Sequence, residues 1–285
     1  MLDLEIHKRN LPSVVTNGMY HLAPVQLYQR VKPYKCHLPT SLFPDFLMTN
    51  LLTKPYSVTI FNVAGFEHLF TLAQSGFEFA RFPVNVQQWT DQTVKAIYLP
   101  TLAQWLKKSY GARDVHFYTY NFRYHNPDDK PAGQHAVKSS FLRAHCDASQ
   151  ETIEARLKVY YPDTYQQLLQ GRVQYLNIWR PITSTPVEDC PLAVCDFRTI
   201  DQGDLVPMDL VYPHYVDEAY EVLYNPAHRW FYKKGMTHED VVIFKLCDNL
   251  TSEAYVCPHA AFLDPTAQAN APPRASIEVK AILMG

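Results

Sequence analysis

The sequence predicts a mainly β protein of the double-stranded β-helix class, a cupin-like jelly roll, with a helical segment before the strands. From residue 111 onward, the chain is dense in aromatic and β-branched residues, in short runs separated by Pro, Gly, Asn and Asp turns. Roughly eight such runs fit a jelly roll built from two sheets. The length of 285 residues suits one domain with elaborations, so we expect a single domain over residues 1–285.

The segment before residue 111 is predicted in two parts. Residues 1–62 carry scattered prolines and short apolar clusters without clear periodicity, which indicates an irregular arm wrapped on the body. Residues 63–110 are expected to be helical, because apolar residues recur at helical spacing in two stretches that end at Gly76 and Gly111. Pro100 is expected to split or kink the second stretch.

The β body is expected over residues 111–285, with a helical insertion at about 150–170. This helix follows Ser149, a good N-cap, and Pro162 marks a break within it. The candidate strands are residues 115–124, 140–147, 173–180, 192–199, 221–223, 229–232, 241–246, 254–262 and 276–283.

Composition excludes several classes of function. Lys and Arg number 26 and Asp and Glu 28, a formal charge of −2 without a basic stripe, so no nucleic-acid partner is expected. The chain begins without the apolar run of a signal peptide and has no stretch of about 18 apolar residues, so we expect no membrane segment and a cytoplasmic protein. The six cysteines form no CxxC pair and are expected to be reduced, mostly buried thiols.

The run RAHCDAS, residues 143–149, contains the first candidate site. Side chains alternate faces along a strand, so His145 and Asp147 would share one face while Cys146 points to the other. Imidazole and carboxylate are ligands that ferrous iron accepts, and a second histidine would complete the two-histidine, one-carboxylate facial triad. An HxD tripeptide alone is also compatible with a hydrogen-bonded pair of surface residues.

The second part of the constellation lies near the carboxyl terminus. His259 is the candidate third ligand, and Arg274 and Ser276 follow it on one face of a predicted strand. The planar guanidinium of arginine makes bidentate, charge-assisted bonds to a carboxylate. The order HxD, distant His, then RxS is what a site for iron and 2-oxoglutarate requires, because the far carboxylate of that cosubstrate needs a fixed cation. The alternative for Arg274 is a salt bridge to Glu278 or to another acid at a strand edge, and for Ser276 a bond to the backbone.

Two polar residues in the apolar run LNIWRP, residues 176–181, are further candidates for cosubstrate binding. Asn177 and Arg180 must either be paired or face a cavity. Strict alternation puts them on opposite faces, and a bulge at Pro181 would be needed to bring both to one pocket. Structural ion pairing of Arg180 is the competing interpretation.

The sequence resembles a family of non-heme iron oxygenases over about residues 76–280. The matching runs are GFEFARFP, GARDVHFYTYNFR, RAHCDAS, NIWRPI, PLAVCD, HRWFY, CPHAAFLDP and PRASIEVK. The family includes fungal gibberellin desaturase, an aspergillic-acid hydroxylase/desaturase and a bacterial protein of cephalosporin 7α-methoxylation. The chain departs from the family pattern after Asp147 and at residues 247–249, which concerns substrate contacts and no proposed ligand.

The resemblance implies an enzyme that uses Fe(II), 2-oxoglutarate and dioxygen to hydroxylate or desaturate a small natural product in secondary metabolism, releasing succinate and CO2. It implies His145, Asp147 and His259 as iron ligands, and Arg274 with Ser276 as the cosubstrate clamp. The alternatives are an iron oxygenase that does not use 2-oxoglutarate, an inactive barrel that acts as a binding protein, and a cupin-like isomerase or metal hydrolase. The amino-terminal arm is long enough to pack against a second subunit, so a homodimer is also considered.

Overall fold

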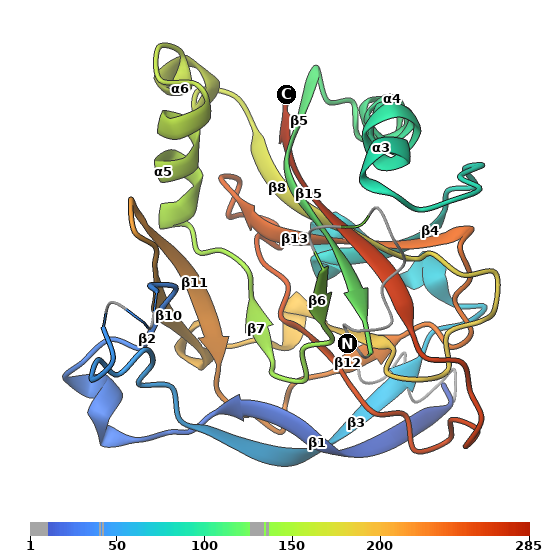
Figure 1. Ribbon diagram of the computed structural model, residues 1–285, viewed down its shortest axis with the longest axis horizontal. Helices are drawn as coiled ribbons and strands as arrows, with labels where there is room; N and C mark the ends of the chain where they lie inside the picture. The colour runs from blue at the N-terminus through green and yellow to red at the C-terminus, as the bar shows by residue number, and fades with distance from the viewer. Residues whose placement is uncertain (1–10, 40, 42, 126–133, 135–136) are drawn as a thin grey trace.

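Two β-sheets face each other in the computed structural model, which describes residues 11–39, 41, 43–125, 134 and 137–285 (Figure 1). The larger sheet has nine strands, in the order β1 (Ser13–Leu22), β3 (Thr53–Asn62), β12 (Trp230–Tyr232), β9 (Leu192–Cys195), β14 (His259–Ala261), β7 (His145–Cys146), β11 (Val216–Val222), β10 (Leu205–Val211) and β2 (Tyr34–Cys36). The smaller sheet has six, in the order β4 (Phe77–Arg81), β13 (Asp240–Asp248), β8 (Val173–Pro181), β15 (Ala275–Met284), β5 (Asp114–Tyr124) and β6 (Val137–Ser139).

The described helical segments are short except for α4 and α5. The α-helices are α2 (Leu72–Ser75), α3 (Asp91–Thr93), α4 (Leu99–Tyr110), α5 (Glu151–Tyr160) and α6 (Tyr165–Leu168). The 3-10 helices are η1 (Gln26–Gln29), η2 (Glu67–Leu69), η5 (Phe197–Thr199) and η6 (Gln202–Asp204), and η3 (Val94–Tyr98) is a π-helix that joins α3 to α4.

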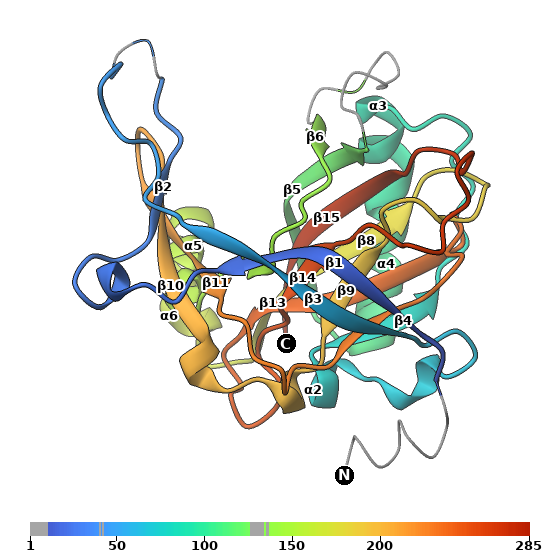
Figure 2. The same ribbon diagram turned by 90° about the horizontal axis from the view of Figure 1, so that it is seen from below.

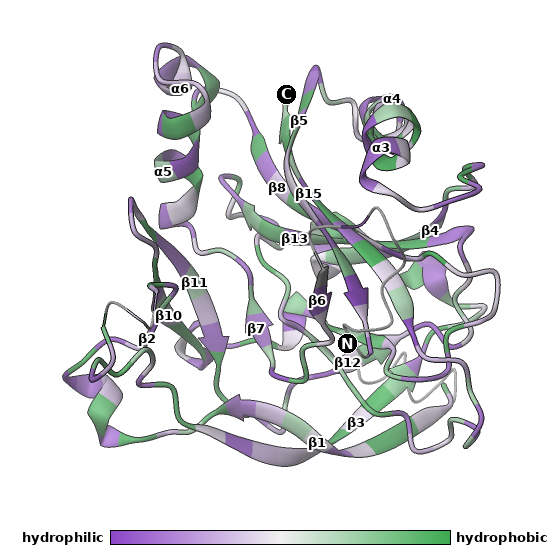
Figure 3. Ribbon diagram, viewed as in Figure 1, coloured by the Kyte–Doolittle hydropathy of each residue, from purple (hydrophilic) through white to green (hydrophobic). Residues whose placement is uncertain are grey.

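The smaller sheet is buried on both faces, which explains the nearly continuous apolar runs of its central strands. On β15, Ile277 and Val279 point outward into a core shared with Leu102 and Leu106 of α4. Residues 276, 278 and 280 alternate with them and therefore point inward. Figure 3 shows hydrophilic residues on β6 and β7, near the region where the two sheets face each other.

The predicted helix that ends at Gly111 is confirmed by α3, η3 and α4. It begins at Thr90, whose side chain accepts a hydrogen bond from the backbone N–H of Thr93, and it ends at Gly111 in the left-handed conformation (φ 67°). Pro100 lies in the first turn of α4, directly after the π-helical turn. The irregularity expected at Pro100 is therefore a local widening of the helix.

Two predictions for the first 110 residues are wrong. The predicted irregular arm contains β1 and β3, which pair antiparallel with Val14 opposite Ile60. The predicted helical range 63–110 includes the strand β4, which pairs with β13. β1 pairs with β3 and β4 pairs with β13, and in each case the partner is distant in the sequence. Such long-range pairing decides the structure where the local periodicity is weak.

The insertion predicted at 150–170 is confirmed as α5 and α6, with Pro162 between them. The N-cap is Gln150, one residue later than predicted. All six cysteines lie in the described part of the chain, are buried and form no disulfide there. Among the described helices, none is both long and apolar enough to span a bilayer.

Candidate active site

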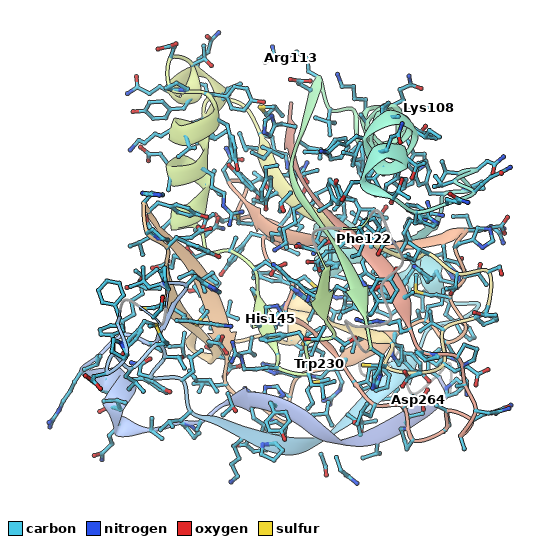
Figure 4. The ribbon with its side chains drawn as sticks, viewed as in Figure 1. Lys108, Arg113, Phe122, His145, Trp230 and Asp264 are labelled. Atoms are coloured by element: carbon cyan, nitrogen blue, oxygen red, sulfur yellow. The ribbon has the colours of Figure 1, made fainter. Side chains whose placement is uncertain are left out.

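His145, Asp147 and His259 come together between the two sheets. Their ligand atoms all lie within 4.8 Å of one another. The arrangement follows from strand register, because His259 on β14 is the direct partner of His145 on β7, and Asp147 comes two residues after His145. Figure 4 shows His145 on β7 near the centre of the molecule.

Hydrogen bonds fix the orientation of both imidazole rings. Nδ1 of His145 lies 2.8 Å from the carbonyl oxygen of Arg143, and Nδ1 of His259 lies 3.1 Å from that of Cys257. A carbonyl only accepts, so each Nδ1 carries the proton and each Nε2 presents a lone pair. Each Nε2 lies 3.6 Å from an oxygen of Asp147. Two imidazole lone pairs and one carboxylate form the donor set that fits Fe(II).

The charge states of these groups suit metal binding. Burial, followed by the neighbouring His259, lowers the pKa of His145 to about 4, so the ring is neutral at physiological pH. Burial opposes ionisation of Asp147, but the neighbouring Lys280 ammonium favours it, and the pKa of Asp147 lies well below its usual range. The site therefore offers an ionised carboxylate and a neutral imidazole without a proton having to leave first.

Cys146 does not belong to the cluster. Its side chain is fully buried in a core between strands of the larger sheet, together with Ala144 and Val222. Alternation along β7 places it on the opposite face from His145, as predicted.

Arg274 is a buried cation beside the two histidines. It is 3% exposed, and His145, His259, Trp179 and Arg274 line one cavity. Its Nη1 donates to the carbonyl oxygen of Cys190, and its guanidinium lies 5.5 Å from the centre of the Trp179 ring. Among the described residues, Nε has no hydrogen-bond partner and no carboxylate forms an ion pair with the side chain. This unsatisfied donor fits a carboxylate ligand.

The predicted salt-bridge alternative for Arg274 is not present, because Glu278 is engaged elsewhere. Both oxygens of Glu278 accept bonds from Arg123, at 2.7 and 2.8 Å, and Asn121 donates a third at 3.0 Å. Ser276 is fully buried two residues from Arg274, and its hydroxyl donates to the carbonyl oxygen of Arg123 at 3.3 Å. The backbone bond considered for this serine is thus present.

Asn177 lies beside the cluster. Its Nδ2 is 3.4 Å from Oδ2 of Asp147, and its Oδ1 has no hydrogen-bond partner among the described residues. Asn177 sits next to Phe244 on β13 and Lys280 on β15, whose side chains share its face of the sheet.

Arg180 is not brought to this site. Its guanidinium lies 5.3 to 5.7 Å from the ring centres of Phe82, Trp89 and Tyr98, on the outer face of the smaller sheet. The pairing of β8 with β15 continues regularly through Pro181, so no bulge turns the side chain inward. The prediction that Arg180 binds the cosubstrate is corrected by this placement.

Alanine in place of Arg180 is expected to destabilise the fold and spare the site. Removing a fully buried side chain that packs on three aromatic rings should lower the free energy of unfolding by about 2–4 kcal/mol. Urea unfolding measures this loss, and Arg180→Met, which keeps the length, should lose less. A large rise in the Kd for 2-oxoglutarate in folded Arg180→Ala would contradict the structural role.

Sequence reasoning missed Lys280. Its Nζ lies 3.0 Å from Oδ2 of Asp147, and its side chain is 14% exposed. The signal was available, since Lys280 follows Arg274 by six residues and so shares its strand face.

Two histidines and one aspartate within a jelly roll are typical of the class of non-heme iron oxygenases, and here they lie beside a buried arginine that has no carboxylate partner among the described residues. The chain belongs to the family described as Oxidoreductase/YMDC permease-like domain, whose model it matches over residues 22–284.

Individual relatives agree with this class. The Fe(II)/2-oxoglutarate-dependent dioxygenase nvfI of Aspergillus novofumigatus is 28% identical over 91% of each chain. The hydroxylase/desaturase efuI of Hormonema carpetanum is 26% identical over 79% of this chain and 82% of that protein. The aspirochlorine biosynthesis protein N of Aspergillus oryzae is 32% identical, but the match covers only 47% of this chain and 58% of that protein.

A solved structure has the same fold. A variant of the iron and alpha-ketoglutarate-dependent endoperoxidase NvfI matches with a TM-score of 0.82 and 25% identity, over 96% of this chain and 99% of that chain. This match confirms the mainly β, jelly-roll prediction. Together, these relatives confirm the resemblance to Fe(II)/2-oxoglutarate-dependent oxygenases that the sequence motifs indicated.

Proposed function

We propose that this protein is an Fe(II)- and 2-oxoglutarate-dependent oxygenase that hydroxylates or desaturates a small-molecule natural product in secondary metabolism. The observation that carries the proposal is the convergence of two oriented Nε2 atoms and one ionised carboxylate beside an unpaired, buried arginine. Relatives named as hydroxylase/desaturase and Fe(II)/2-oxoglutarate-dependent dioxygenase support it.

The donor set assigns a role to each residue. His145, Asp147 and His259 hold Fe(II), while Arg274 binds the distal carboxylate of 2-oxoglutarate, with Ser276 beside it. Asn177 is close enough to the cluster to contact the cosubstrate or to hold Asp147. When bound, Fe(II), 2-oxoglutarate and dioxygen supply the oxidation of a C–H bond, with release of succinate and CO2.

The chain itself orients these groups and excludes water. Phe244 packs against the ring of His259, with centres 4.5 Å apart, and Phe141 meets the ring of His145 edge-on at 4.6 Å. The carbonyl oxygens that bind each Nδ1 prevent ring rotation. Trp179 forms an apolar wall beneath Arg274, where low polarity strengthens the bond to a carboxylate.

Two observations disfavour the alternatives. An iron oxygenase without 2-oxoglutarate leaves the guanidinium of Arg274 buried and without a carboxylate, an arrangement that costs several kcal/mol. An inactive barrel requires no intact ligand set, yet all three donors are present and oriented. A cupin-like isomerase or a metal hydrolase does not bind 2-oxoglutarate and so does not need Arg274 to hold its distal carboxylate.

Succinate formation tests this function. Purified protein with Fe(II), 2-oxoglutarate and dioxygen is expected to release succinate in proportion to oxygen consumed, with a rate that rises when an authentic substrate is added. Chromatographic assay of succinate and a parallel oxygen electrode measure both. Oxidation of a substrate without any succinate would favour the oxygenase that does not use 2-oxoglutarate.

The oligomeric state is a separate proposal. The segment around β2 projects from the body (Figure 2), and it carries exposed apolar side chains, with Phe46 49% and Leu47 64% exposed. Burial of such residues between two subunits would stabilise a dimer, so we expect a homodimer. Light scattering on eluting protein measures its mass, and Leu47→Asp should shift it to a monomer; a monomeric mass for the unaltered chain would contradict the proposal.

The proposal also covers the cellular location of the enzyme and the kind of molecule that it binds. Six buried, unpaired thiols are typical of a reducing compartment, which supports a cytoplasmic enzyme. A net charge of −2 supports a small-molecule substrate and no nucleic-acid partner.

A further inference from the structure

The inward face of the smaller sheet carries a row of charged side chains at its β15 strand. Strand register aligns Lys280 with Asn177 and Thr119, and Glu278 with Trp179 and Asn121. Cross-strand partners share a face, so these side chains all border the space next to the proposed iron ligands.

On this face, Arg123 and Glu278 neutralise each other. Arg123 and Glu278 form two bonds of 2.7 and 2.8 Å, and Asn121 satisfies Glu278 further. The pair carries no net charge and leaves no cation available for a ligand.

Lys280 is different, because its partner is a proposed iron ligand. The ion pairs of the described residues give it one carboxylate, Asp147, at 3.0 Å. The Lys280 side chain is 14% exposed and therefore largely removed from water. A cation held this far from solvent requires a counter-charge.

When Fe(II) and 2-oxoglutarate bind, the carboxylate of Asp147 no longer balances the charge of Lys280, a step that rests on the proposed function. The two positive charges of Fe(II) are balanced by Asp147 and the metal-binding carboxylate of 2-oxoglutarate, and the distal carboxylate balances Arg274. The ammonium of Lys280 then remains as an uncompensated positive charge next to the iron.

A second cation lies on the strand at the edge of the same sheet. Lys138 on β6 is the cross-strand partner of Arg123 and so faces the same space. It is exposed, and among the described residues it forms no ion pair with a carboxylate.

We propose that Lys280, with Lys138, binds an anionic oxygen group of the substrate, so that the enzyme acts on small acids that carry a carboxylate or an ionised enol or phenol. The anion supplies the counter-charge that the loaded site lacks. Because Lys280 contacts Asp147, the anion places the rest of the substrate beside the metal. Recognition of charge also favours encounter with acidic molecules over neutral ones of the same shape.

The experiment uses two probes that differ in charge. Naphthalene-2-carboxylate and naphthalene-2-carboxamide are titrated without oxygen into the full chain loaded with Fe(II) and saturating 2-oxoglutarate, which occupies Arg274. Binding is read from the shift of the visible iron-to-ketoacid absorption band. The acid is expected to bind at least roughly tenfold more tightly than the amide, because a charge-assisted bond contributes about 1.5–3 kcal/mol. Equal binding, or no binding of either probe at millimolar concentration, overturns the proposal.

Variants assign the effect to the lysines. Lys280→Met should weaken binding of the acid at least roughly tenfold and leave binding of the amide unchanged. Lys280→Arg should bind the acid as the unaltered chain does. Lys138→Met alters an exposed residue, so it should fold normally and weaken binding of the acid about threefold. Lys158→Met, on α5 and paired with Glu154, is the matched control and should match the unaltered chain.

Two outcomes separate this inference from the proposed function. If the absorption band never forms in the unaltered chain, the proposed function fails. If the band forms but Lys280→Met loses it, Lys280 acts by holding Asp147, and the assignment to substrate is overturned. Unchanged affinity for the acid in both Lys280→Met and Lys138→Met overturns it as well.

Discussion

Replacing His259 with alanine is expected to weaken Fe(II) binding by at least roughly a hundredfold. Loss of a group that only orients a metal ligand costs 10–100-fold in affinity, so loss of a ligand itself must cost more. His259 is 5% exposed and its Nε2 faces Asp147, so neither solvent nor another described imidazole is positioned to replace it within the cluster. Competition with a chelator under anaerobic conditions measures the affinity.

The control for this variant is His68→Ala, which removes an exposed histidine on η2. It should bind Fe(II) as the unaltered chain does. An affinity in His259→Ala within a few-fold of this control would show that His259 is not a ligand.

Replacing Arg274 with alanine is expected to raise the Kd for 2-oxoglutarate by roughly a hundredfold while Fe(II) affinity stays unchanged. Truncation of one partner of a buried, hydrogen-bonded charge pair costs about 2–5 kcal/mol, and the cosubstrate carboxylate would lose the buried guanidinium of Arg274. Arg274→Lys should recover part of the affinity, because an ammonium keeps the charge but not the planar fork. Titration of the absorption band with 2-oxoglutarate measures Kd directly.

Arg81→Ala provides the matched control, since Arg81 is 67% exposed and pairs with Glu239 away from the site. Its Kd for 2-oxoglutarate should equal that of the unaltered chain. If Arg274→Ala also kept this Kd, the carboxylate would have to be held elsewhere, and the role assigned to the RxS element would be lost.

The core strands were predictable because strands buried on both faces have continuous apolar runs in the sequence. The apolar runs of β8, β13 and β15 are buried on both faces, which leaves a dense β signature in the sequence. The amino-terminal strands left no such signature. β1 alternates buried and exposed residues over a stretch interrupted by Gly18, and it depends on pairing with β3, some forty residues away.

The candidate site was predictable where chemistry and alternation agree. Alternation predicted His145 and Asp147 on one face, and in the structure Asp147 directly follows β7 and lies beside His145. The structure adds that His259 is the direct cross-strand partner of His145, which no sequence pattern states. Arg180 shows the opposite case: strict alternation already placed it on the opposite face from Asn177, and the bulge at Pro181 that its site role required is not present. Lys280 was missed because a lysine in a strand is more often solvent-facing than directed into a site.

The most direct test of the account is the visible absorption band that forms when Fe(II) and 2-oxoglutarate bind together without oxygen. The unaltered chain is expected to show the band, His145→Ala to show none, and Arg274→Ala to show it only at much higher 2-oxoglutarate concentration. These outcomes follow from the three ligand atoms within 4.8 Å of one another and the unpaired guanidinium beside them. Absence of the band in the unaltered chain, or an unchanged band in both variants, would contradict the account.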